Sequence, residues 1–153
     1  MAGWRRAIVI EFLPDKQINN EALAKAILHG FASTRFAQSH KLSFWKSEVI
    51  KDEVVEGRKE FEIHVNHDLS KTDLALKFYC FISIEHKRPK TVSIVGDTTD
   101  SDHYLSKNHR EIVMNIPMSV KKDIRLAVYD GDYDLESVEE LLSSGYVEIL
   151  IKK

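Results

Sequence analysis

The chain has 153 residues, of which 43% are hydrophobic and 30% charged, with 6 glycines and 3 prolines. This length and composition fit one globular domain, residues 1–153, and exclude the disordered, collagen-like and low-complexity classes. The formal net charge of -2 excludes a strong overall cationic field, so binding to nucleic acid or to anionic membranes must come from local patches.

The amino-terminal third predicts one strand followed by a long helix. Residues 7–13 form an apolar run that Pro14 ends, which predicts a strand. Asn19 or Asn20 then caps a helix from Glu21 to about Ala37, because apolar side chains recur there at helical spacing. We expect this to be the longest helix of the chain, and its apolar stripe requires a sheet to cover.

The middle of the chain predicts most of that sheet. Residues 41–50 begin with an apolar alternation, and the charged residues 51–56 predict a connection. Strict alternation over residues 59–65 and 74–85 predicts two antiparallel strands. Residues 91–95 are β-branched and follow a basic turn, so they complete a hairpin.

The last third predicts a loop, two strands, a helix and a final strand. Residues 97–110 are polar and lack periodicity, which indicates a long mobile loop, and residues 111–116 predict a short strand. Alternation from residue 123 predicts another strand, a helix follows Asp134, and residues 146–151 return as a strand. The fold class is therefore α+β, an antiparallel sheet of five to six strands with one long helix on a face and a short C-terminal helix.

Motifs for metal binding or catalysis are weak. Asp130, Asp132 and Asp134 resemble the start of a calcium loop, but the glycine and the bidentate glutamate of that loop are missing. His64 and His67 are three residues apart, so a regular strand places them on opposite faces. The single cysteine, Cys80, lies in an apolar strand, which predicts a buried and unreactive thiol. We expect no metal, no cofactor and no catalytic residue.

Basic residues occur in three short groups, at Arg5 and Arg6, from His86 to Lys90, and at Lys121 and Lys122. If the fold brings two of these groups together, they make a cationic patch for phosphates of lipid or RNA. Residues 1–6 lack the apolar run of a signal peptide. No stretch approaches the ~20 apolar residues of a membrane span, so we expect a protein that stays inside the cell.

The order of the elements resembles that of rhabdovirus matrix proteins. The resemblance rests on the strand AIVIEFL with the helix NEALAKAILHGF, on the basic HKRP turn, and on DIRLAVYD with the acidic helix DLESVEELL. It covers about half of the chain. The family's lysine-rich arm has no counterpart here, and the chain is slightly acidic where many members are basic.

The resemblance implies a viral structural protein that self-associates and bridges a ribonucleoprotein to the inner surface of a membrane. Its partners would be itself, the viral nucleocapsid and an anionic membrane, in the virion and in the host-cell cytoplasm or nucleus. We expect membrane or nucleocapsid contact at Arg5, Arg6, Lys87, Arg88 and Lys90. We expect self-association through the predicted loop, at Asp100, His103, Tyr104 and Leu105.

Two other classes stay open at this point. One is a protein-binding module, of the inhibitor or immunity type, whose acidic residues 130–140 meet a basic partner. The other is a small hydrolase with an unrecognised site, for which His64 or His103 beside a carboxylate in a pocket would be the sign.

Overall fold

The computed structural model describes residues 6–55, 58–66, 75–83, 89–131 and 147–153. The elements of this part of the chain are β1 (Ala7–Phe12), α1 (Asn20–Ala32), α2 (Arg35–Ser39), β2 (Phe44–Lys46), β3 (Ile50–Val55), β4 (Arg58–Val65), β5 (Lys77–Ser83), β6 (Thr91–Gly96), α3 (Thr99–Met114), α4 (Met118–Lys121), β7 (Ile124–Asp130) and β8 (Val147–Lys152). The α+β class predicted from the sequence is confirmed.

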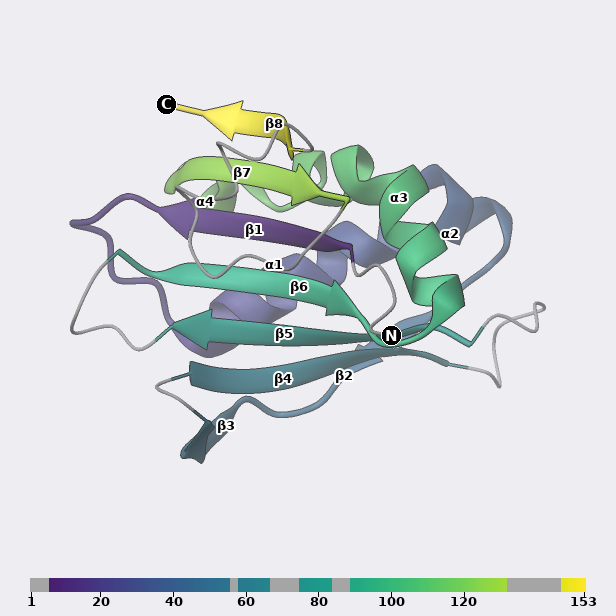
Figure 1. Cartoon of the computed structure of the whole chain (residues 1–153), viewed down its shortest axis with the longest axis horizontal. Coiled ribbons are helices and arrows are strands. Elements are labelled where there is room, and N and C mark those ends of the chain that lie inside the picture. The colour runs from purple at the N-terminus through teal and green to yellow at the C-terminus, as the bar shows by residue number, and fades with distance from the viewer. Residues whose placement is uncertain (1–5, 56–57, 67–74, 84–88, 132–146) are drawn as a thin grey trace.

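The eight described strands form one antiparallel sheet in the order β2-β4-β5-β6-β1-β7-β8, with β3 also paired to β4. Figure 1 shows β8 at one edge of the sheet and β2 and β3 at the other. The sheet has more strands than the five to six expected. Part of the reason is that residues 51–56 were wrongly predicted as a connection, whereas β3 runs from Ile50 to Val55.

The alternating strands are confirmed, and one of their faces builds the main core. β5 buries Phe78, Cys80 and Ile82, while Tyr79 and Phe81, between them, are half-buried. The main core cluster joins this strand face to apolar residues of α1, α2 and α3. A smaller cluster consists of Ala7, Val9, Val95, Leu126 and Val128, which alternate with the main core residues and so belong to the opposite face of the sheet.

The first predicted helix is two helices. Asn19 caps α1, because its side chain accepts a hydrogen bond from the backbone N–H of Ala22 (3.0 Å). α1 ends at Ala32, and Thr34 then caps α2 by accepting from the backbone N–H of Ala37 (3.1 Å). A second capping residue inside the apolar stripe therefore divides the helix predicted as far as Ala37.

The predicted mobile loop at residues 97–110 is wrong, because this segment lies largely in α3. Thr98 caps the helix, with Asp100 and Asp102 in the first turn, where acidic side chains favour the helix dipole. α3 has 16 residues and α1 has 13, so α3 is the longest helix described. The strand predicted at residues 111–116 is also wrong, since α3 continues to Met114.

The C-terminal elements are described in part. β7 and β8 match the predicted strands and pair with each other, with an irregularity between Ala127 and Val128. The helix predicted after Asp134 lies outside the described residues. No helix in the described ranges is both long enough and apolar enough to span a membrane.

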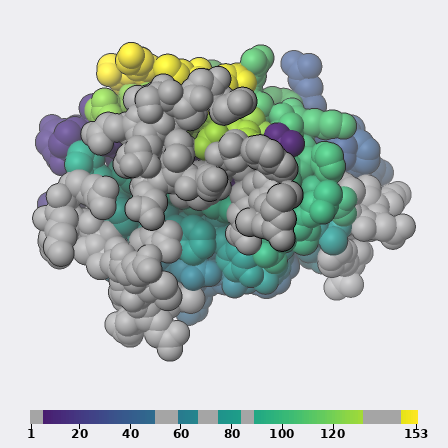
Figure 2. All heavy atoms as spheres, viewed as in Figure 1, coloured from purple at the N-terminus to yellow at the C-terminus, as the bar shows by residue number. Residues whose placement is uncertain are grey.

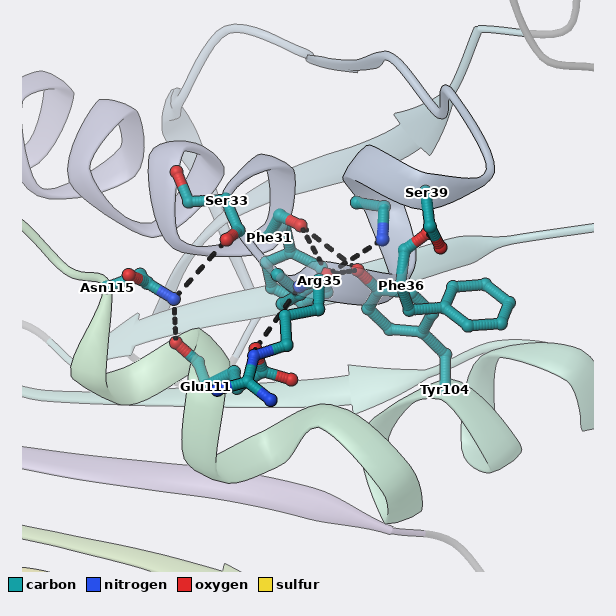
Figure 3. A network of polar contacts seen from close by, with 10 residues as sticks. Phe31, Ser33, Arg35, Phe36, Ser39, Tyr104, Glu111 and Asn115 are labelled. Atoms are coloured by element: carbon teal, nitrogen blue, oxygen red, sulfur yellow. Dashed lines mark hydrogen bonds and ion pairs between the residues drawn. The ribbon is translucent and has the colours of Figure 1, made fainter.

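The helices α1 and α3 cross closely in the main core. A methyl group at Gly30 would lie 2.4 Å from the backbone oxygen of Ile112 in α3. Beside this point the ring of Phe31 packs on those of Phe78 and Tyr104, with centroid separations of 4.6 and 5.9 Å. Figure 3 shows the polar contacts along the same junction, where the Asn115 side chain donates to the Ser33 carbonyl (3.4 Å).

We expect Gly30→Ala to destabilise the protein by about 1–3 kcal/mol, the usual cost of overpacking. Helix propensity alone predicts that the variant is more stable, because alanine is favoured over glycine by ~1 kcal/mol in a helix. Urea unfolding of the two proteins measures the difference. A more stable variant would contradict the close crossing.

Candidate functional site

The four residues expected to mediate self-association do not form one exposed site. Tyr104 and Leu105 are buried in the main core. Asp100 accepts a hydrogen bond from the backbone N–H of Ala75 (3.0 Å), and His103 is exposed on α3. An interface built on Tyr104 or Leu105 would have to unpack α3, so these two assignments are wrong.

The residues expected to contact membrane or nucleocapsid are also separated. Lys90 is buried, and its ammonium group donates to the carbonyl of Ile18 and to the Asn20 side chain. It therefore fixes the segment before α1 and is not a surface cation, so this assignment is wrong. The guanidinium of Arg6 donates to the hydroxyl of Tyr129 (3.5 Å). The others, Arg5, Lys87 and Arg88, lie outside the described residues.

A different set of cations does converge, beginning on the outer face of α3. Because residues three and four apart share one side of a helix, His103, Lys107, Arg110 and Met114 form one exposed stripe. The opposite side of α3 is buried against the core through residues that include Tyr104, Leu105, Ile112 and Val113. Packing of that apolar side directs the basic stripe outward.

The chain after α3 extends the stripe. Lys121 of α4 donates to the carbonyl of Met114 (2.7 Å), which holds it at the end of α3. Lys153, at the end of β8, donates to the carbonyl of Lys122 (2.6 Å) although the two are 31 positions apart. Pairing of β8 with β7 thus brings Lys153 to the end of α4.

The start of β8 is held against α3 by a charged contact. Glu148 accepts a hydrogen bond from Arg110 and lies 3.0 Å from the Nε2 atom of His109. The hydrogen bond from Arg110, followed by that from His109, lowers the pKa of the Glu148 carboxyl below its usual value. β8 is therefore tied to α3 at one end and to α4 at the other.

We use the name basic surface for Lys107, Arg110, Met114, Met118, Lys121, Lys122 and Lys153. Within the described part of the chain, its five cations are contacted by two carboxylates, Glu148 at Arg110 and Asp123 at Lys122 (3.8 Å), which leaves an excess of three positive charges. Figure 2 shows that β8, in yellow, forms the rim of the molecule at this edge. The protein of net charge -2 therefore has a strongly cationic edge.

Two large apolar side chains lie within the basic surface. Met114 is 56% exposed and Met118 is 63% exposed. Exposed apolar side chains beside lysines are the combination found on protein surfaces that lie on a membrane.

His109 and Cys80 are held by contacts within the fold. His109 has both ring nitrogens at acceptors, the Leu105 carbonyl (2.9 Å) and Glu148, and its ring stacks on Tyr129. Burial raises the pKa of the Cys80 thiol well above its usual value, which opposes a nucleophilic role. Within the described ranges no three His, Cys, Asp or Glu side chains are grouped to hold a metal ion. His67, Asp132 and Asp134 lie outside those ranges.

Comparison with protein-family models, with curated proteins and with solved structures finds no match to this chain. Arguments about function therefore rest on the residues and their geometry.

Sequence reasoning named Lys121 and Lys122 but missed the rest of the basic surface. The spacing of Lys107, Arg110 and Met114 at three and four residues was a readable helical signal, hidden by the prediction of a loop. The approach of Lys153 to Lys122 depends on strand pairing between distant segments, for which the sequence has no local signal.

Tyr104, which was predicted at an interface, lies in the core, and its ionisation can test that position. Its hydroxyl lies 2.8 Å from Thr34 Oγ1 and donates to the Phe31 carbonyl (3.0 Å), and burial raises its pKa to about 12. The pKa of the Tyr104 hydroxyl is higher in the folded protein than the value of about 10 in the unfolded chain. The neutral hydroxyl therefore stabilises the folded state, and this contribution to the free energy of unfolding is complete below pH 10. It is lost as the pH rises towards 12.

We expect an absorbance titration of the five tyrosines to show a step near pH 12 that Tyr104→Phe removes and Tyr79→Phe leaves in place. Tyr104→Phe should also cost about 1–2 kcal/mol of unfolding free energy at neutral pH, because buried partners lose a hydrogen bond. A step near pH 12 that persists in Tyr104→Phe would contradict the buried position.

Proposed function

We propose that this protein is a non-enzymatic structural protein of the viral matrix type, which binds the inner surface of an anionic membrane through the basic surface. The observation that carries the proposal is the convergence of Lys121, Lys122 and Lys153 around exposed Met114 and Met118. The nucleocapsid and further copies of the chain remain the other partners, as the matrix resemblance implies.

The charge of the basic surface supports membrane binding of moderate strength. Each lysine or arginine near an anionic leaflet contributes about 1 kcal/mol, so an excess of three charges contributes about 3 kcal/mol. That is roughly a hundredfold in the binding constant. One subunit would thus bind weakly and reversibly, and linked copies would bind strongly because their sites act together.

The methionines favour a membrane over RNA as the ligand of this surface. Phosphates of either ligand would pair with the lysines, but only a lipid layer also takes up unbranched apolar side chains. Methionine is flexible enough to enter the headgroup region without a preformed pocket. The position of Met118 at the start of α4, three residues before Lys121, fits entry beside the charged groups.

We expect Lys122→Glu with Lys153→Glu to reduce binding to phosphatidylserine-containing vesicles by at least tenfold, because the excess charge of the basic surface falls from three to minus one. Vesicle cosedimentation at low salt measures this. The matched control is Lys25→Glu with Lys41→Glu, which changes net charge equally at two exposed lysines outside the basic surface. Equal losses in both double variants would show a net-charge effect and contradict a local site.

We expect Met114→Ser with Met118→Ser to weaken vesicle binding while leaving binding to single-stranded RNA unchanged. The reason is that serine removes the apolar contact and keeps every charge. Cosedimentation and an RNA filter assay on the same preparations separate the two ligands. If RNA binds more tightly than the vesicles, or if the methionine variant binds vesicles as the parent does, the membrane assignment is wrong.

A further inference from the structure

A second exposed feature lies at the other edge of the sheet, at Trp45 in β2. The indole ring stacks on the imidazole of His64 in β4, with centroids 4.3 Å apart and planes inclined by 8°. His64 is held in turn by Glu62, whose Oε1 atom lies 2.8 Å from Nε2. Trp45 is nevertheless 48% exposed, so much of its surface remains accessible to solvent.

Carboxylates lie beside this ring stack. Lys77 lies 3.9 Å from Glu62 and 3.9 Å from Asp97, so all three groups are close together. Among these described groups two carboxylates share one ammonium group, which leaves one negative charge.

This chemistry selects one kind of ligand. A guanidinium group is planar and cationic, stacks on an indole face and hydrogen-bonds to a neighbouring carboxylate. A phosphate would be repelled by the same carboxylates, which disfavours nucleic acid even though a nucleobase can also stack on tryptophan. An apolar ligand would gain nothing from the charged rim.

We propose that the exposed indole of Trp45, with Glu62, binds an arginine side chain of a basic polypeptide segment. The stack with His64 holds the indole in one orientation, so little side-chain freedom is lost on binding. Figure 1 places β2 and β4 at the edge of the sheet opposite β8, so this aromatic site is separate from the basic surface. The protein would thus recognise an anionic partner at one edge and a cationic polypeptide at the other.

The test uses the full chain labelled with ¹⁵N and a five-residue probe, acetyl-Gly-Arg-Gly-Arg-Gly-amide. We expect saturable shifts of the Trp45 indole N–H signal, which Trp4→Phe distinguishes from the other tryptophan, and of the β4 amides. The same peptide with citrulline in place of arginine keeps the shape and loses the charge, and we expect it to bind at least tenfold more weakly. Added salt should weaken binding of the arginine peptide.

Variants locate the site. Trp45→Ala and Glu62→Gln should each reduce the affinity for the arginine peptide at least tenfold, judged from β4 amide shifts. The control variant Asp15→Asn removes an exposed carboxylate elsewhere and should change this affinity less than twofold. Trp45→Tyr keeps an aromatic face and should retain part of the binding, which separates loss of contact from loss of folding. Equal binding of the citrulline peptide, undiminished binding by Trp45→Ala, or preference for a single-stranded oligonucleotide would each overturn the proposal.

Discussion

The arrangement of this protein depends on the close crossing of α1 and α3. Gly30 allows the two backbones to touch at Ile112, and the rings of Phe31 and Tyr104 fill the space between the helices and β5. Because this packing fixes the rotation of α3 about its own axis, it decides which side chains face solvent. The exposed stripe that carries Lys107, Arg110 and Met114 is the direct consequence.

Charged side chains of opposite sign lie at the two edges of the sheet. β8 is joined to α3 through Glu148 and to α4 through Lys153, and so completes a cationic edge. β2 and β4 carry the Trp45–His64 stack and its carboxylates at the other end. The formal net charge of -2 is the sum over the whole chain, in which the two regions partly cancel. The net charge alone therefore gives no guide to the partners that we propose.

Much of the sheet could be predicted, because a strand with one buried face has a period of two that is visible in the sequence. β4, β5 and β7 were found in this way, as was the buried thiol of Cys80. β3 was missed because the run IKDEVV has three charged residues among its six, and its pairing with β4 is a tertiary effect.

The errors about function came from α3 and from Lys90. α3 is polar overall, and its buried residues include Asn108 and His109, which satisfy their hydrogen bonds on the backbone of the preceding turn. Its apolar residues were therefore assigned to a loop and a strand. Lys90 was taken as part of a basic turn, but its ammonium group is buried against backbone and amide oxygens near the start of α1. Charge in the sequence does not reveal whether a lysine is a surface cation.

The most direct test of this account is hydrogen–deuterium exchange of the unmodified protein, with and without phosphatidylserine-containing vesicles. The account predicts slower exchange in the C-terminal half of α3, in α4 and in β8, with β4 and β5 unchanged. Protection confined to β4 and β5, or no protection at any salt concentration, would contradict the claim that α3 and β8 together form a membrane-binding surface.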